Sequence, residues 1–267
     1  MQVNVLASGS RGNATLISLG GVKLLVDAGI STRRIKTELD KVGVNIGDLD
    51  GVLITHEHRD HISGLSTLTR KYGVPVYARP AAWEAILNDS KTCDVPTACQ
   101  RELTSSLDIG GVKIEPFDIS HDAVEPVGFR LYHKHTKCAF ATDLGFVTDS
   151  VKKALSLSDV IILEANHDVD MLNQGSYPWF LKKRILSNKG HLANTDAGWT
   201  LARLQQKKNC HVFLAHLSQE NNRPEVAEKT VSDILSEQSY KIGTDISLYL
   251  TYPDKASSIP TDRRLSI

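Results

Sequence analysis

The chain has 267 residues, of which 41% are hydrophobic and 23% charged, a composition ordinary for a globular protein with one large or two small cores. Its 31 basic and 31 acidic residues cancel, so a polyanionic substrate requires a local basic patch rather than the field of the whole chain. The sequence has neither an apolar run near the roughly 18–20 residues of a membrane span nor a signal-peptide pattern at residues 1–5, so we expect a cytoplasmic protein without a membrane partner.

The first half of the chain alternates short strands with helices. Apolar runs predict strands at residues 3–6, 14–18, 22–26, 51–54 and 76–77. Ser31 can cap a helix that ends at Gly43, and Pro80 can open another helix over 81–87. A further helix is expected over about 62–71, directly after a dense group of histidines.

The second half repeats this alternation. Strands are expected at 112–117, 127–133, 138–142, 160–163, 211–215 and 247–251, and helices at 150–156, 177–187, 195–207 and 225–237. Strand-rich blocks that are each followed by helices indicate an α/β fold, in which two sheets pack face to face under helices. We expect a single domain over residues 1–252 and a polar, poorly ordered tail at 253–267.

The densest group of chemically active side chains follows the predicted strand at 51–54. His56, His58, Asp60 and His61 form an HxHxDH pattern. Histidine is the commonest transition-metal ligand, and four such groups are costly to bury together without a cation. His56 and His58 point the same way in an extended segment, whereas Asp60 and His61 lie at the turn into a helix. The pattern therefore predicts ligands for two adjacent ions.

Other metal-capable side chains also stand where predicted strands end. His121 provides a third ligand for the first ion, and His216 provides one for the second. Asp143 follows the strand at 138–142 and can give one carboxylate oxygen to each ion, which sets a separation of ~3.5–4 Å. Asp27 is expected to orient the cluster by hydrogen bonds rather than to bind metal. Loops at one edge of a rigid sheet pair are a common place for such a composite site.

The order of these motifs resembles that of the metallo-β-lactamase fold superfamily, in which Asp, HxHxDH, His, Asp and His follow one another. The likeness extends from Asp27 to His216. Within the superfamily the chain looks like the WalJ/YycJ group of bacterial exonucleases. The supporting segments are 6–13 (LASGSRGN), 121–129 (HDAVEPVGF), 163–168 (LEANHD), 177–186 (YPWFLKKRIL), 190–192 (GHL) and 215–222 (AHLSQENN). Ala193 stands where the group has a serine, so no hydroxyl is available at that position.

This resemblance implies a four-layer αββα sandwich with a centre for two divalent ions, zinc or manganese. By position, one ion belongs to His56, His58 and His121, the other belongs to Asp60, His61 and His216, and Asp143 lies between them. The group further implies that the substrate is DNA, hydrolysed in the 5′ to 3′ direction during DNA repair. Composition and spacing by themselves indicate only a two-metal hydrolase.

The expected mechanism follows from charge. Two cations lower the pKa of a shared water, so that a metal-bound hydroxide attacks the phosphate, and they neutralise the charge that grows in the transition state. Asp60 is the candidate acceptor for the proton of that water. His167 is the candidate acid for the leaving group, with hydrogen-bonded support of the site as its alternative role.

A DNA substrate also needs contacts away from the metals, because phosphate neutralisation supplies much of the affinity. Lys182, Lys183 and Arg184 form the densest basic run, and Tyr177 and Trp179 precede it. These aromatic rings can stack on bases. The alternative is a solvated helix face with Trp179 packed beneath it.

Two further pairs of residues are candidates for phosphate binding. His191 and Asn194 flank the start of the predicted helix at 195–207, whose free amides favour an anion. Ser10 and Asn13 can bind phosphate at the opposite rim of the expected site. An equal alternative is that they stabilise a turn.

Two other functions compete with the exonuclease. A small-molecule hydrolase acting on a cyclic phosphodiester, lactone or thioester fits the neutral net charge, whereas the basic run and the long segment at 160–222 favour a nuclease. A binding protein without turnover is disfavoured because no motif position is substituted. The sequence leaves the oligomeric state open, a homo-oligomer included.

Overall fold

The computed structural model describes residues 1–89 and 94–260, whose strands form two seven-stranded mixed sheets. The first sheet has the spatial order β14 (Ser257–Ser258), β1 (Gln2–Ala7), β2 (Ala14–Leu19), β3 (Val22–Val26), β4 (Gly51–Leu53), β5 (Val76–Ala78) and β6 (Gln100–Glu102). The second has the order β13 (Ile246–Leu250), β12 (Cys210–Ala215), β11 (Val160–Glu164), β10 (Thr136–Ala141), β9 (Val127–His133), β8 (Val112–Asp118) and β7 (Leu107–Ile109).

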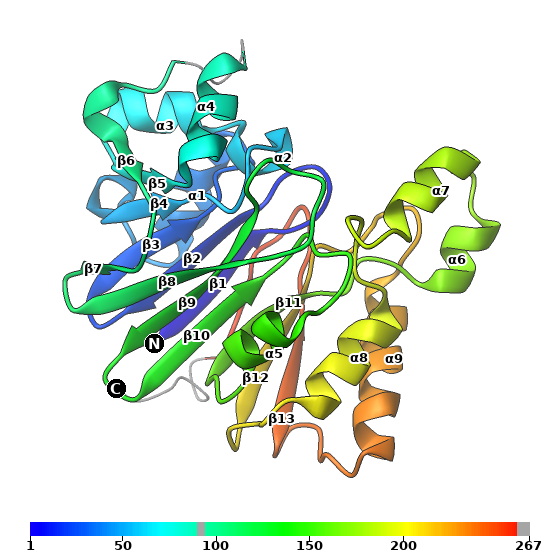
Figure 1. Ribbon diagram of the computed structural model, residues 1–267. Coiled ribbons are helices and arrows are strands. Elements are labelled where there is room, and N and C mark those ends of the chain that lie inside the picture. The colour runs from blue at the N-terminus through cyan, green and yellow to red at the C-terminus, as the bar shows by residue number, and fades with distance from the viewer. Residues whose placement is uncertain (90–93, 261–267) are drawn as a thin grey trace.

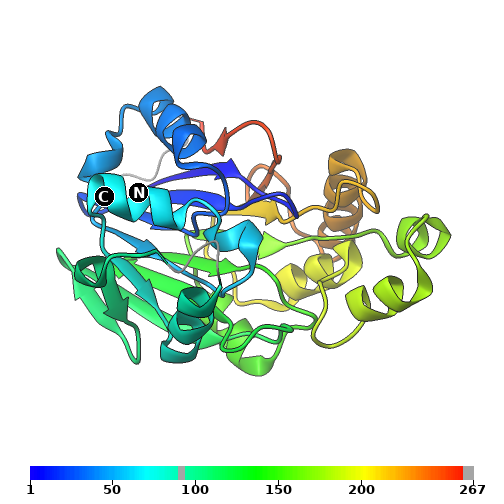
Figure 2. The same cartoon turned by 90° about the horizontal axis from the view of Figure 1, so that it is seen from above.

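Helices cover the outer face of each sheet, which makes four layers (Figure 1, Figure 2). The first sheet is covered by α1 (Thr32–Lys41), α3 (Leu65–Tyr72) and α4 (Pro80–Asn88). The second is covered by α5 (Asp149–Leu155), α8 (Asn194–Arg203) and α9 (Pro224–Glu237). The predicted αββα sandwich is therefore confirmed.

The two sheets are held together by a core of alternating side chains. Along β3, Leu24 and Val26 point between the sheets, whereas Leu25 points towards the helices. Phe129 of β9 and Phe213 of β12 fill the space opposite them and are fully buried. Each large apolar side chain buried in this way contributes about 1.5–3 kcal/mol, so the edge of the sheet pair is a rigid base for loops.

Two local sequence cues act as predicted, and one does not. The Ser31 hydroxyl accepts a hydrogen bond from the Arg34 amide at the start of α1, and Gly43 follows that helix with a left-handed φ of 72°. The helix expected over 62–71 is instead interrupted, giving α2 (Arg59–Ile62) and α3. The break lies at Gly64, where an added Cβ would come within 2.2 Å of the Ile30 carbonyl oxygen. Close approach of the two backbones ends the first helix.

Several short elements carried no periodic signal and were not predicted. These are the 3-10 helices η1 (Ile46–Asp48) and η2 (Thr97–Cys99), strands β6, β7 and β14, and helix α6 (Val169–Gln174). The helix expected over 177–187 is the shorter α7 (Trp179–Ile185). Together, α6 and α7 project from the body as an arm beside the sheet edge (Figure 1).

The tail behaves differently from its prediction. β14 pairs antiparallel with β1, matching Asn4 with Ser258, and Ile259 is buried in the core between the sheets. A strand edge has unpaired amides and carbonyls, which explains why a polar segment is held there. Residues 261–267 of the predicted tail lie outside the described residues. Among the helices described, none has the length and apolar character required to cross a membrane.

Candidate metal centre

The loop after β4 brings the first three imidazoles together. The ring centroids of His56 and His58 lie 4.6 Å apart, and the ring of His121, in the loop after β8, lies 5.0 and 5.1 Å from them. One ring nitrogen from each histidine lies within 4.8 Å of the others. The structure therefore assembles the first predicted ligand group from segments 65 residues apart in the chain (56 to 121).

A second group forms next to the first. Asp60 and His61 lie in α2, and His216 follows β12 in the other sheet. The Asp60 Oδ2 atom lies 3.5 Å from His61 Nε2 and 3.6 Å from His216 Nε2. Tertiary packing thus completes the second predicted group as well.

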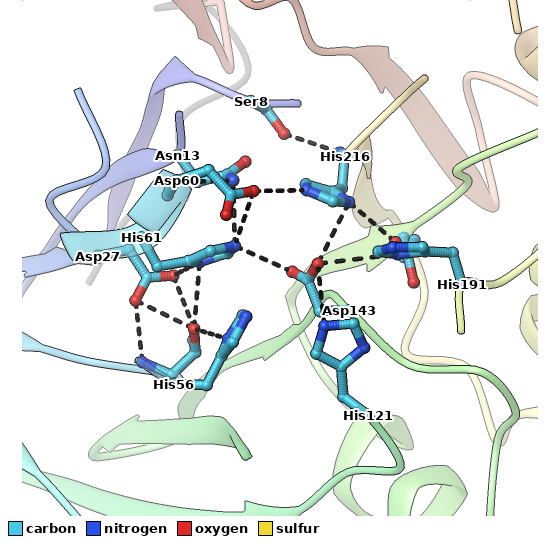
Figure 3. A network of polar contacts seen from close by, with 12 residues as sticks. Ser8, Asn13, Asp27, His56, Asp60, His61, His121, Asp143, His191 and His216 are labelled. Atoms are coloured by element: carbon cyan, nitrogen blue, oxygen red, sulfur yellow. Dashed lines mark hydrogen bonds and ion pairs between the residues drawn. The ribbon is translucent and has the colours of Figure 1, made fainter. Parts of the chain in front are cut away.

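Asp143 lies between the two groups (Figure 3). Its Oδ2 atom is 3.4 Å from Nε2 of His61, and its Oδ1 atom is 4.0 Å from Nε2 of His121. The side chain is nearly inaccessible to solvent. One carboxylate therefore faces both groups, as a bridging ligand must.

Three residues of the centre have an unusual backbone. Asp27, Asp143 and His216 each lie one or two residues after a strand and have left-handed φ values of 61°, 61° and 55°. Such a conformation costs a non-glycine residue of order 1–3 kcal/mol and persists only when neighbours hold it. His216 is held by a 2.7 Å hydrogen bond from its amide to the Ser8 hydroxyl and by Asn166, whose Nδ2 donates to its carbonyl. The turns aim these side chains along the sheet edge into the centre.

Asp27, expected to orient the cluster, is hydrogen-bonded to His61 and Thr55. Its Oδ2 atom accepts a 2.8 Å hydrogen bond from Nδ1 of His61, and its carboxylate also accepts from the amide and hydroxyl of Thr55. Both Asp27 and His61 are completely buried. The hydrogen bond at Nδ1 directs the Nε2 atom of His61 towards Asp60 and Asp143.

Glu164 also lies at the centre, although no sequence motif marks it as a site residue. Its carboxylate ends β11 and accepts hydrogen bonds from Nδ1 of His191 at 2.8 Å and Nδ1 of His216 at 3.0 Å. The amides of Leu144 and Leu192 also donate to it. One feature of the sequence could have indicated its role: Glu164 directly follows four apolar residues of a buried strand, and that strand ends at the sheet edge where the other site residues lie.

The tautomer of His121 is also fixed by its surroundings. Its Nδ1 atom lies 3.2 Å from the carbonyl oxygen of Gly190, so that nitrogen donates and Nε2 faces the centre. Gly190 is required at this position, because a Cβ would lie 2.1 Å from the carbonyl oxygen of Ile185. The turn after α7 thus contacts the first ligand group through the hydrogen bond between Gly190 and His121.

The residues present fit divalent metal ions. His56 Nε2, His216 Nε2 and Asp143 Oδ2 are buried and have no hydrogen-bond partner in the described part of the chain. Burying such atoms unpaired is costly, and all three are lone-pair donors that point into the centre. Nitrogen and carboxylate donors in this mixture suit zinc and manganese.

The two groups differ in their electrostatics. Burial, followed by the charges of His61 and His121, lowers the pKa of His56 well below its usual value, so its ring is neutral as a metal ligand must be. For His216, burial opposes protonation, but Asp143, Asp60 and Glu164 outweigh it and raise the pKa to about 10. The acid-rich group therefore attracts positive charge, which a metal ion supplies in place of protons.

A pocket of about 250 Å³ opens onto the centre. Three residues predicted to contact substrate line it, namely Ser10, Arg184 and His191. Residues of the arm, Tyr177 and Leu181 among them, form one of its walls. The pocket thus joins the metal ligands to the basic run by way of α7.

Other predicted substrate contacts lie elsewhere. The Asn13 amide bonds to Gly9 and to the Asp60 carbonyl, which corresponds to the turn-stabilising alternative. Asn194 is buried and pairs reciprocally with the amide of Asn222. Lys182 donates to two backbone carbonyls. These side chains are occupied because buried or anchored polar groups must find partners within the protein.

His167 is buried, whereas Trp179 is exposed. His167 is buried beside the centre rather than among the residues lining the pocket, and burial lowers its pKa to about 4. Trp179 is 72% exposed, so the alternative in which it packs beneath its helix is wrong. Lys183 is exposed on the same helix.

A model of the beta-lactamase superfamily domain matches residues 23–216. Over 262 residues, the sequence is 39% identical to the exodeoxyribonuclease YycJ of Bacillus anthracis, covering 97% of this chain and 98% of that protein. It is also 39% identical over 258 residues to the exodeoxyribonuclease WalJ of Streptococcus pneumoniae serotype 2, strain D39, covering 96% of each. The fold is similar to the crystal structure of the metallo-beta-lactamase fold protein YhfI from Bacillus subtilis, with a TM-score of 0.71, 18% identity, and coverage of 96% and 98%.

Proposed function

The chain belongs to the beta-lactamase superfamily and, within it, to the WalJ/YycJ type, and from this premise we propose that this metal-dependent hydrolase is a binuclear exodeoxyribonuclease. The observation that carries the proposal is the position of Asp143, whose carboxylate lies within 4.0 Å of ring nitrogens in both ligand groups, those of His61 and His216 in one and that of His121 in the other. Two-metal hydrolysis of phosphodiesters uses such a shared carboxylate. Action from the 5′ end and a role in DNA repair belong to the same proposal.

Each ligand group holds one ion in this proposal. His56, His58 and His121 form the nitrogen-rich site, and Asp60, His61 and His216 form the oxygen-containing site. When bound, zinc or manganese ions supply Lewis-acid charge, which lowers the pKa of water and offsets the charge of a phosphate. The protein holds these ligands in place through Asp27 and Glu164, so little reorganisation accompanies the reaction.

Asp60 is the proposed acceptor of the proton from the attacking water. Its Oδ2 atom lies beside both His61 and His216, and its side chain is partly open to the pocket. A carboxylate in this place can hold the water by a hydrogen bond as well as take its proton.

The acid for the leaving oxygen is His191 rather than His167. His191 lines the pocket, and Glu164 binds its Nδ1 atom, which leaves Nε2 directed to the substrate side. Glu164 also stabilises the protonated ring: although burial opposes it, the charge and hydrogen bond of this carboxylate raise the pKa of His191. His167, with a pKa lowered to about 4, holds too little proton at neutral pH for this role.

The lining of the pocket suits a phosphodiester substrate. Arg184 lies in the pocket wall together with the proposed ligands His58 and Asp60, where its guanidinium can pair with a phosphate. The same lining also suits a cyclic mononucleotide. A small-molecule phosphodiesterase is therefore the second candidate.

The test is digestion of end-labelled DNA by protein that has been stripped of metal and then reloaded with Mn²⁺ or Zn²⁺. A 5′ to 3′ exonuclease releases mononucleotides from the 5′ label first and leaves a 3′ label on progressively shorter chains. Cyclic mononucleotides are assayed in parallel. Turnover of these alone, with intact DNA, would reject the nuclease in favour of the second candidate.

A further inference from the structure

The arm formed by α6 and α7 exposes two neighbouring aromatic side chains. Trp179 is 72% exposed and Phe180 is 74% exposed, although each ring has 150–250 Å² to bury. Adjacent exposed rings on a projecting helix are a costly surface unless a partner covers them. They begin α7, on the arm that stands away from the body in Figure 1.

The same helix forms the wall of the metal pocket. Leu181, Arg184 and Ile185, spaced by three and four residues, line the pocket together with Tyr177. Phe180 lies four residues before Arg184, and Trp179 lies four residues before Lys183, so each ring neighbours a basic side chain on the surface of α7. Phe180 thereby adjoins the pocket by way of Arg184, and a chain leaving the pocket along α7 passes over the aromatic pair.

The arm is fixed in position rather than free to fold onto the body. Lys182 Nζ donates to the carbonyls of Asn173 and Gly175 at 2.7 Å each, which ties α7 to α6. Arg184 Nε donates to Asp122 Oδ2 at 2.5 Å, which ties α7 to the loop holding His121. Because these contacts preorganise the rings, a ligand that stacks on them pays little to order the arm.

Charge indicates which partner the rings receive. The segment 177–189 contains four basic residues, Lys182, Lys183, Arg184 and Lys189, and no acidic residue, in a chain whose total charge is zero. A two-fold contact between arms of two copies would place these like charges against each other. A single nucleic-acid strand offers both flat bases for the rings and phosphates for the cations.

We propose that Trp179 and Phe180 stack on unpaired bases of the DNA strand next to the metal pocket, while Lys183 contacts its phosphates. This inference rests on the proposed function and adds that the DNA is single-stranded next to the pocket. Trp179 and Phe180 are not among the residues that line the pocket, so the bases they meet are those next to the nucleotide held at the metal centre. The enzyme thus holds a strand that has separated from its complement at the end being cut.

The experiment measures binding of fluorescein-labelled phosphorothioate DNA, which resists hydrolysis, to the metal-loaded protein by fluorescence anisotropy. The variant Trp179→Ala/Phe180→Ala is compared with Trp179→Phe/Phe180→Tyr, which keeps the rings. Leu186→Ala, another exposed apolar residue of the same arm, is the matched control. Turnover of thymidine 5′-(p-nitrophenyl phosphate), which has no second base, reports on the pocket itself.

The alanine variant should bind single-stranded DNA about 5- to 100-fold more weakly than the parent protein does, and its binding of blunt duplex DNA should weaken less. The other two variants should bind as the parent protein does. Turnover of the mononucleotide ester should be unchanged. Equal DNA binding by all variants would overturn the inference while leaving the nuclease proposal intact. A dimeric parent and a monomeric alanine variant in light scattering would assign the rings to a second copy and overturn it too. Failure of the parent protein to cleave DNA would instead reject the proposed function, and the inference with it.

Discussion

The carboxylate of Glu164 accepts a 2.8 Å hydrogen bond from Nδ1 of His191, at the inner wall of the metal pocket. The same Oε1 atom lies 3.0 Å from Nδ1 of His216. One buried carboxylate thus orients a proposed metal ligand and the proposed acid. This shared support explains why β11 ends in a charged residue although the strand is otherwise apolar and buried.

Replacing Glu164 with Gln should impair both functions that depend on it. Loss of a carboxylate that orients a metal-ligating histidine typically lowers metal affinity or activity about 10- to 100-fold. We expect a fall of this size in kcat for DNA and a weaker affinity for Zn²⁺ by competition with a chelator. An unchanged affinity and rate would show that the Glu164 contacts do not orient the centre.

The substitution His191→Ala should affect substrates according to their leaving group. DNA hydrolysis expels a basic sugar oxygen that needs a proton, and loss of a general acid costs about 10²- to 10⁴-fold. Bis(p-nitrophenyl) phosphate expels a stable anion and should lose much less. Metal content by mass spectrometry should remain that of the parent protein. Equal losses on both substrates would argue against His191 as the acid.

The substitution His58→Ala should remove most of the metal from the nitrogen-rich group and abolish turnover. This histidine is one of three in its group, so its loss leaves the ion with two imidazoles besides the shared Asp143 carboxylate. Metal content is measured by inductively coupled plasma mass spectrometry. His135→Ala is the control, since that histidine is outside all of the groups formed by described residues. A fully active His58 variant with two bound ions would contradict the assignment.

Removing the metals should make stability depend on pH. Although burial opposes protonation of His216, its acidic neighbours raise its folded pKa to about 10, above the value of 6.5 that an unfolded chain has. The stabilisation from its protonation is therefore complete below pH 6.5 and is lost as pH rises to about 10. Tm of chelator-treated protein should fall across this range, and Tm of metal-loaded protein should fall less. Parallel Tm curves would contradict the expected exchange of protons for metal.

The substitution Asp27→Asn should weaken the fold as well as the centre. The buried Asp27 carboxylate accepts from Thr55 and His61, and an amide nitrogen in place of one oxygen leaves a donor facing a donor. We expect the free energy of unfolding to decrease by about 1–3 kcal/mol. Asp48→Asn, at an exposed ion pair, is the control and should change stability little. Equal urea midpoints for both variants would contradict this account.

Some elements could be predicted from local patterns, because the residues of a single segment contain all the information that identifies it. The apolar runs of β3, β4, β11 and β12 identify buried strands, and the HxHxDH loop follows one of them within three residues. Helix α6 and strands β6, β7 and β14 could not be predicted in this way. β6 and β14 are polar segments whose pairing partners lie far away in the sequence, and β7 and α6 are too short to show a periodic pattern.

The amino-acid sequence by itself determined which side chains can bind metal, because histidine and aspartate at strand ends are a property of the chain. Only the tertiary structure decided their geometry. It placed Asp143 between two ligand groups that each combine residues from both sheets, and it assigned Glu164 to His191 and His216. It also divided the basic run, turning Arg184 to the pocket and Lys182 to backbone carbonyls. The physical reason is that direction and burial depend on packing between distant segments, which spacing along the chain does not record.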